Sequence, residues 1–133
     1  MSNTCEIKLT IRHTDPVMMK KAIDAFDTEF LETMLPLPEG QDSNDYYGTW
    51  WINAEEEMVD EIEEVYCTSA NVPPLEAFDL LSKQGYYIEA TFFEPASYFY
   101  GYYSSTEGTN WIDYTDEDEI PEEIIDLFNY EIC

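Results

Sequence analysis

Apolar side chains occupy every second position from Cys5 to Ile11, and polar side chains occupy the positions between them. A period of two predicts a half-buried strand. Thr14-Asp15-Pro16 follows and predicts a helix start, with Thr14 as the expected N-cap and Pro16 in the first turn. Apolar residues then recur at helical spacing, which predicts a helix that reaches Phe26.

The middle of the chain predicts two strands and a second helix. Prolines and a glycine break regular structure over residues 35–40, and the polar run to Asp45 is expected to be a loop. The aromatic run Tyr46–Ile52 predicts one strand and Ile62–Thr68 the next, with their turn in between. Asn71-Val72-Pro73-Pro74 then begins a helix, which Gly85 ends.

The last third predicts more strands and a final helix. Tyr86–Phe93 and Ser97–Ser105 read as strands, and Glu107–Asn110 is a hairpin-type turn into a strand over Trp111–Thr115. A helix with an apolar stripe starts near Pro121.

The resulting order, β-α-β-β-α-β-β-α, predicts an α+β fold of the ferredoxin-like split βαβ type. The sheet is expected to be mostly antiparallel, with helices on one face and an added C-terminal strand and acidic helix. Neither a repeat nor a flexible linker interrupts the sequence. We therefore expect a single domain over residues 1–133, with an acidic extension from about residue 113.

Size and composition agree with one globular domain. The 133 residues are 44% hydrophobic, which is enough to fill a core. The sequence has neither an apolar run near the roughly 18 residues of a membrane helix nor a signal peptide pattern, so we expect a cytoplasmic protein. Cys5, Cys67 and Cys133 have no paired metal spacing and are expected to be reduced thiols.

Charge is distributed unevenly. The sequence has 30 Asp and Glu against five Lys and Arg, a formal net charge of −25. Residues 1–34 contain six acids and four bases, which leaves 24 acids and only Lys83 in the remainder. A field of this sign repels nucleic acid and anionic membranes, so the sequence argues against binding either one directly and favours a basic partner or a cation.

Two clusters contain 15 of those 24 acids, and apolar residues are interleaved with both, which predicts that the carboxylates are fixed in space. Such an array is similar to the phosphates of duplex DNA, with about one charge per 1.7 Å of axis. The alternative is a generally acidic or halophilic protein, although uniform adaptation would not leave the first quarter nearly balanced. The first cluster consists of Glu55, Glu56, Glu57, Asp60, Glu61, Glu63 and Glu64. The second consists of Asp113, Asp116, Glu117, Asp118, Glu119, Glu122, Glu123 and Asp126.

Signatures of an enzyme are sparse. His13 is the single histidine and precedes a helix start, where a surface or capping role is expected. The sequence contains no glycine-rich phosphate loop. Asp116–Glu119 and Asp42–Tyr47 fall short of a calcium loop at the third ligand position and at the turn glycine. We expect no enzymatic activity, no cofactor and no dedicated metal site, while weak binding of divalent cations to the acidic clusters stays open.

The strand that includes Tyr98–Tyr103 is aromatic on both faces. One face is expected in the core and the other under a covering element or a partner. This strand or the stripe at Ile124–Phe128 could also form the patch of a homodimer, so monomer and homodimer both stay open.

Several stretches taken together resemble a family of small phage- and plasmid-borne proteins of unknown function with a ferredoxin-like domain. The stretches, in family order over about residues 3–105, are Asn3 and Cys5 with Leu9 and Ile11, Leu35–Glu39, Tyr47–Ala54, Tyr66–Pro74, and Phe93-Glu94-Pro95 with Phe99 and Gly101. The resemblance implies a ferredoxin-like fold and an origin on a mobile element, and it implies no catalytic residues.

Charge and origin together lead to a functional hypothesis. Phages and plasmids meet host nucleases that hold DNA in basic grooves, which an anionic decoy can block. We therefore expect a DNA-mimic inhibitor in the host cytoplasm, directed at a CRISPR effector or, next, a restriction or repair nuclease. The alternative is an acidic module that sequesters a basic host DNA-binding protein without mimicking DNA.

Overall fold

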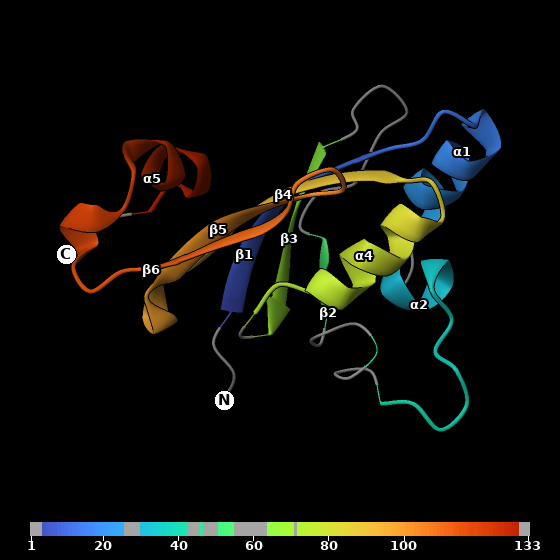
Figure 1. Ribbon diagram of the computed structural model, residues 1–133, viewed down its shortest axis with the longest axis horizontal. Coiled ribbons are helices and arrows are strands. Elements are labelled where there is room, and N and C mark those ends of the chain that lie inside the picture. Colours follow the sequence, from blue (N-terminus) through green and yellow to red (C-terminus); the bar gives the residue numbers. More distant parts are fainter. Residues whose placement is uncertain are drawn as a thin grey trace.

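Six strands in the described part of the chain form one open sheet in the order β2-β3-β1-β4-β5-β6, and every neighbouring pair is antiparallel (Figure 1). With its helices, this sheet makes an α+β fold. The computed structural model describes residues 4–25, 30–42, 46, 51–54, 64–70 and 72–130. The strands are β1 (Thr4–Arg12), β2 (Trp51–Ala54), β3 (Glu64–Ala70), β4 (Tyr87–Glu94), β5 (Phe99–Ser104) and β6 (Gly108–Asp113). The helices are α1 (Pro16–Ala25), α2 (Phe30–Met34), α4 (Leu75–Lys83) and α5 (Glu122–Phe128), with short 3-10 turns η1 (Pro95–Ser97) and η2 (Glu117–Glu119).

β1 occupies the middle of the sheet. The four apolar residues at alternate positions from Cys5 to Ile11 are fully buried, which confirms the predicted apolar face. The strand pairs with β3 on one side and β4 on the other, so that Ile7 lies opposite both Cys67 and Phe92. A strand paired along both edges has no open backbone edge for another chain.

Helices α1, α2 and α4 cover the face of the sheet to which these apolar residues point. The predicted start of α1 differs by one residue, because Asp15 and not Thr14 provides the capping side chain. Asp15 Oδ1 accepts a hydrogen bond of 2.9 Å from Val17 N. Asp15 directly precedes Pro16, where a carboxylate reaches the free N–H groups of the first turn. Phe26, the expected end of this helix, lies outside the described residues.

The predicted limits of α4 are confirmed. The helix follows Pro73-Pro74, its residues Phe78 and Leu81 are fully buried, and Gly85 comes directly after its last turn with a φ of +92°. A side chain at Gly85 would be strained by that φ and would meet His13 Nε2 at 2.9 Å.

The expectation that all helices share one face is wrong for α5. Phe92 of β4 belongs to the core beneath α4, whereas Phe93 belongs to a second core with Ile124 of α5. Successive strand residues point to opposite faces of a sheet, so α5 covers the face opposite to α1, α2 and α4 (Figure 1). The two cores therefore sandwich the strands.

Some predicted boundaries shift. Tyr46, expected to begin a strand, is helical, and its N–H donates to Asp42 O at 3.0 Å. The strand of that region is β2, while positions 47–50 and the turn expected within 54–60 lie mostly outside the described residues. β6 begins at Gly108 and not at Trp111, because the turn is closed at Gly108, which has a φ of +79° and pairs with Ser104.

No helix in the described segments is long and apolar enough to cross a membrane.

Candidate interaction surface

The first acidic cluster lies almost wholly outside the described residues. Glu64 is its member within them: it begins β3, and its backbone is opposite Thr10 of β1. The expectation that this cluster contributes to a binding surface therefore stays a prediction.

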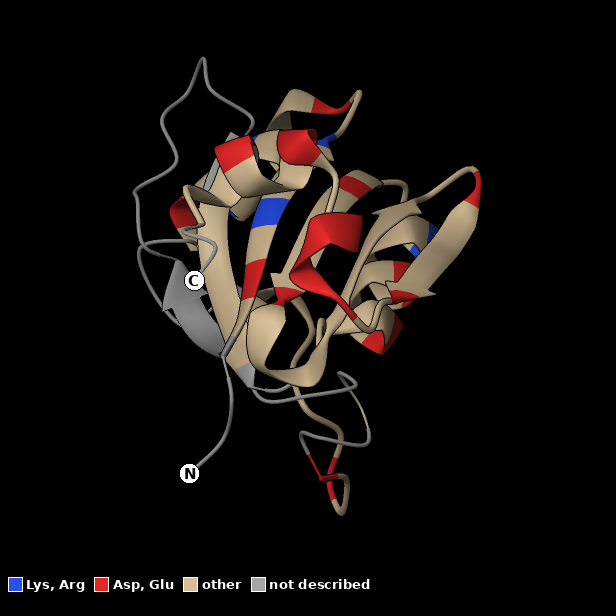
Figure 2. Cartoon of the chain, turned by 90° about the vertical axis from the view of Figure 1, so that its left-hand side faces the viewer, with Lys and Arg blue, Asp and Glu red and all other residues tan. Residues whose placement is uncertain are grey.

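The second acidic cluster runs from the end of β6 through η2 and α5. Seven of its side chains are exposed and that of Glu117 is half-buried. Figure 2 turns this side of the molecule toward the viewer and shows acidic segments spread over it. We call the eight residues the C-terminal acidic cluster: Asp113, Asp116, Glu117, Asp118, Glu119, Glu122, Glu123 and Asp126.

Apolar anchors fix the backbone of this cluster to the sheet. Ile120 and Ile124, which alternate with its acids, are 5% and 1% exposed. The ring of Phe128 stacks on Phe93 of β4 at a centroid distance of 5.9 Å, and Tyr130 meets the same ring edge-on at 5.1 Å. The carboxylates are therefore carried by a packed element and not by a solvated tail.

Local hydrogen bonds orient three of the carboxylates. Asp113 Oδ1 accepts from Trp111 Nε1 at 3.0 Å, and Asp116 Oδ1 accepts from Asp118 N at 2.9 Å at the start of η2. Glu119 Oε2 accepts from Thr115 N at 3.0 Å. Each bond removes some of the rotational freedom of a charged side chain.

Two tyrosines orient two more carboxylates. Tyr102 of β5 donates its hydroxyl hydrogen to Glu123 Oε1 at 3.0 Å, and Tyr130 donates to Glu117 Oε2 at 3.2 Å. Burial and, next, this hydrogen bond raise the pKa of Tyr102 to about 12. The phenol therefore stays protonated and remains a donor to Glu123 even at about pH 10 to 11, where an ordinary tyrosine ionises.

The remaining three acids are the least constrained. Asp118, Glu122 and Asp126 are exposed and accept no side-chain hydrogen bond from any described residue. Within the same part of the chain, none of the eight carboxylates is paired with a lysine or arginine; the ion pair Lys20–Asp24, at 3.2 Å, belongs to α1. The cluster thus presents negative charge that described cations do not neutralise.

His13 is half-buried and makes hydrogen bonds through both of its ring nitrogens. Its Nδ1 accepts from Asp15 N at 2.9 Å, which leaves Nε2–H to donate to Gln84 O at 3.2 Å. Its ring meets Tyr86 edge-on at 4.7 Å. Both ring nitrogens are thereby occupied in joining the start of α1 to the end of α4.

Cys5 and Cys67 are buried and form no disulfide bond within the described residues, and Cys133 lies outside those residues. Burial and, to a smaller extent, the nearby Glu94 carboxylate raise the pKa of the Cys5 thiol to about 12. Among described residues, no group of three or more His, Cys, Asp and Glu side chains is placed to hold a metal ion.

The aromatic strand and the apolar stripe of the last helix, considered above as dimer patches, are largely covered within the chain. Tyr100, Tyr103 and Ile124 are 7%, 4% and 1% exposed, whereas Tyr98, which comes just before β5, is 50% exposed. The two faces of β5 enter the two different cores, so the face expected to lie under a covering element or a partner is covered within the chain.

Sequence reasoning did not find the tyrosine donors of this surface. The sequence pattern predicts Tyr102 in an aromatic strand and Glu123 in an acidic helix, and it predicts no contact between them. One feature of the sequence pointed to this contact. Alternation along β5 places Tyr100 and Tyr102 on the face opposite to Tyr103, and two aromatic side chains on that face indicate that another element of the chain covers it.

No model of a known protein family matches this chain, nor does any curated protein or solved structure.

Proposed function

We propose that this protein is a DNA-mimic inhibitor encoded by a mobile element. It blocks the basic DNA-binding channel of a host defence complex, with a CRISPR effector as the first target class and a restriction or repair nuclease as the second. It acts in the bacterial cytoplasm by filling this channel and excluding DNA, and it needs neither catalysis nor a cofactor. It acts as a monomer or a homodimer.

One observation carries the proposal: the C-terminal acidic cluster is largely exposed, most of its carboxylates are oriented, and no lysine or arginine of the described residues is paired with it. Hydrogen bonds orient five of its carboxylates, and the second core holds the backbone of all eight. Fixing like charges close together destabilises a fold through self-repulsion, so a function other than stability is the simplest reason to keep them. A basic groove that binds phosphate rows attracts such an array.

The fold supports the inferred origin. We infer a ferredoxin-like split βαβ core, because the order β2-β3-β1-β4 with two helical crossovers is the arrangement that such a unit produces. β5, β6 and α5 extend this core. This inference agrees with the resemblance to small phage- and plasmid-borne proteins, from which the mobile-element origin is proposed.

A second candidate is an acidic module that sequesters a basic host DNA-binding protein without imitating DNA. It is favoured by the breadth of the charge, since 24 acids against Lys83 follow residue 34 and only eight belong to the C-terminal acidic cluster. Under this alternative, affinity follows total charge and not the position of any carboxylate.

A capture experiment tests the proposal. The protein is immobilised, exposed to lysates of bacteria with different CRISPR and restriction systems across a salt series, and eluted with excess duplex DNA. Retention of a defence complex that duplex DNA displaces supports mimicry. Proteins that resist DNA competition, or no retained protein, would contradict it.

Matched charge variants then separate position from total charge. Asp118→Lys, Glu122→Lys and Asp126→Lys reverse three cluster residues that accept no described side-chain hydrogen bond, so the fold is expected to persist. Glu32→Lys, Glu39→Lys and Glu76→Lys reverse three exposed acids elsewhere, and three reversals take either protein from −25 to −19. Mimicry predicts loss of binding in the first variant only, whereas an equal effect in both supports the sequestering module.

The first acidic cluster has its own variant, in which Glu56, Glu57, Glu61 and Glu64 are replaced by Lys. Loss of inhibition is expected if both clusters enter the DNA channel. Unchanged inhibition would remove this cluster from the interface.

A further inference from the structure

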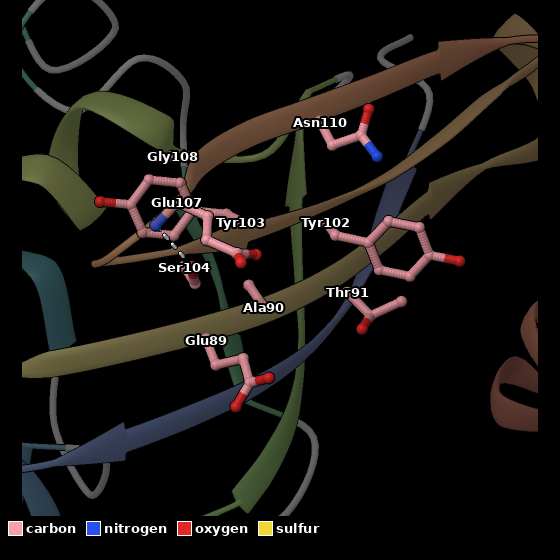
Figure 3. Close-up of a pocket in the computed structure, with 9 residues that line it drawn as sticks. All are labelled: Glu89, Ala90, Thr91, Tyr102, Tyr103, Ser104, Glu107, Gly108 and Asn110. Atoms are coloured by element: carbon pink, nitrogen blue, oxygen red, sulfur yellow. Dashed lines mark hydrogen bonds between the residues drawn. The ribbon is translucent and has the colours of Figure 1, made fainter.

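A cavity of about 240 Å³ lies on the sheet where β4, β5 and β6 run side by side (Figure 3). Two cross-strand rows form its floor. The rows are Thr91–Tyr102–Asn110 and Glu89–Ser104–Gly108. Tyr102 also belongs to the second core, so the cavity opens on the same face of the sheet as α5.

Two carboxylates and an amide in this cavity have no partner among the described residues. Glu89, Glu107 and Asn110 are exposed, and their side chains make no hydrogen bond or ion pair in that part of the chain. Figure 3 shows Glu89 and Glu107 toward one side of the cavity and Tyr102 with Asn110 toward the other. On the neighbouring strand β1, Lys8 lies opposite Thr91 and Arg12 lies opposite Tyr87, so each is one diagonal position from Glu89.

Two hydrogen bonds hold parts of the cavity wall. Ser104 Oγ accepts from Glu107 N at 2.9 Å and holds the turn that carries Glu107. Tyr102 is held by its hydrogen bond to Glu123 of the C-terminal acidic cluster. The turn backbone and the Tyr102 ring are therefore held in place, whereas the side chains of Glu89, Glu107 and Asn110 make no bond within the described residues.

Size and chemistry together identify the occupant. The volume is below the roughly 300–1,000 Å³ of pockets for drug-sized ligands, so it suits one side chain better than a metabolite. Two carboxylates, an amide oxygen and a phenol ring match a guanidinium group, which donates in a planar fork and stacks on aromatic rings. A lysine ammonium would also be attracted by the two carboxylates, but it is not planar and cannot stack on the phenol ring as a guanidinium does.

Access is open from one side. β6 is the edge strand, and its residues Gly108, Thr109 and Asn110 are all exposed. No described strand lies beyond it. A protein surface can therefore approach the cavity and α5 together.

We propose that this cavity receives an arginine side chain of a basic protein partner, as a second contact point beside the C-terminal acidic cluster. The identity of the partner as a basic protein rests on the proposed function, whereas recognition of the guanidinium group is a property of the cavity alone. Basic DNA channels are rich in arginines that contact phosphate, and one of them would be held here between Glu89 and Glu107.

The test uses the full chain and three blocked tripeptides, Gly-Arg-Gly, Gly-Lys-Gly and Gly-citrulline-Gly, titrated while backbone amide NMR shifts are followed. Citrulline has the shape of arginine without its charge. We expect saturable shifts at residues 89–91, 102–104 and 107–110 with the arginine peptide, weaker binding of the lysine peptide, and no binding of the citrulline peptide.

Variants locate the binding. Glu89→Gln with Glu107→Gln is expected to weaken binding of the arginine peptide at least about tenfold, because it removes both charged acceptors. Glu32→Gln with Glu76→Gln removes the same amount of charge elsewhere and is expected to leave binding unchanged.

Three results would overturn the proposal: equal affinity for the arginine and lysine peptides, shifts confined to η2 and α5, or equal weakening by the two double variants. The assay needs no host target. Its failure would therefore leave the DNA-mimic proposal intact, and failure of the capture experiment would leave the arginine site intact.

Discussion

The ring of Phe92 lies against the backbone of Gly101 on the neighbouring strand. A Cβ at Gly101 would come within 2.5 Å of Phe92 Cζ and would also clash with Asn110 O. The missing side chain makes room for Phe92 beneath Trp111, whose ring stacks on Phe99 at 4.1 Å. An aromatic layer on β4, β5 and β6 thus depends on one glycine.

Gly101→Ala is therefore expected to destabilise the protein by about 1–3 kcal/mol, the usual cost of overpacking a core. Urea denaturation followed by tryptophan fluorescence measures this change. Thr109→Ala on the exposed edge strand is the control and should stay within about 0.5 kcal/mol of the wild type. Wild-type stability of Gly101→Ala would show that the contact with Phe92 relaxes without cost.

Ile124→Ala tests whether binding depends on the fixed positions of the carboxylates in the C-terminal acidic cluster or only on their charge. Ile124 is 1% exposed and anchors α5 to the second core. Its truncation should cost about 2–5 kcal/mol and loosen α5 without altering the net charge. Amide hydrogen exchange should rise in α5, and affinity for a DNA-competable target should fall.

Ile124→Val is the matched control, with an expected cost of about 0.5–1.5 kcal/mol and near-normal binding. Unchanged binding of Ile124→Ala, together with faster exchange in α5, would favour the sequestering module, because charge alone would then suffice.

The stability of the protein should decrease at alkaline pH. Cys5 is fully buried, and its pKa is raised from 9.0 to about 12, mainly by burial. Between these values the unfolded chain loses the thiol proton and the folded chain keeps it, so stability is complete below pH 9 and falls as pH rises. The contribution of Cys5 is about 1.4 kcal/mol per pH unit. Burial also raises the pKa values of Tyr103 and Tyr114 to about 12, which steepens the fall above pH 10.

Urea denaturation of the wild type and Cys5→Ala between pH 8 and 10 checks this effect. The variant should show a shallower loss of stability between pH 9 and 10, whatever its stability at pH 8. Parallel curves would mean that the thiol titrates normally in the folded state.

His13→Ala should cost about 1–2 kcal/mol, because it removes the hydrogen bonds to Asp15 N and Gln84 O and the edge contact with Tyr86. Thr14→Ala, by contrast, should change the free energy of unfolding by less than about 0.5 kcal/mol, since Asp15 provides the cap. Thermal unfolding of both variants tests the assignment. A larger loss in Thr14→Ala than in His13→Ala would reverse it.

The local pattern of the sequence predicted most elements of the fold. Backbone geometry depends on residues close together in the sequence. It therefore accounts for the alternation from Cys5 to Ile11 and for the helix limits at Pro73 and Gly85. Tyr46 was misassigned because an aromatic residue packs equally well in a helix or a strand, and its hydrogen bond to Asp42 is not visible in residue type. The site was harder to predict, because the distance from Tyr102 to Glu123 is set by how α5 docks.

The sequence by itself determined the sign, size and asymmetry of the charge, the apolar periods and the presence of an acidic last helix, since these are properties of residue order alone. The tertiary structure decided that α5 covers the second face, that tyrosines of β5 and the C-terminus orient Glu123 and Glu117, and that Glu89 and Glu107 share a cavity. These outcomes depend on strand register and docking, which bring residues far apart in the chain within a few ångströms of one another.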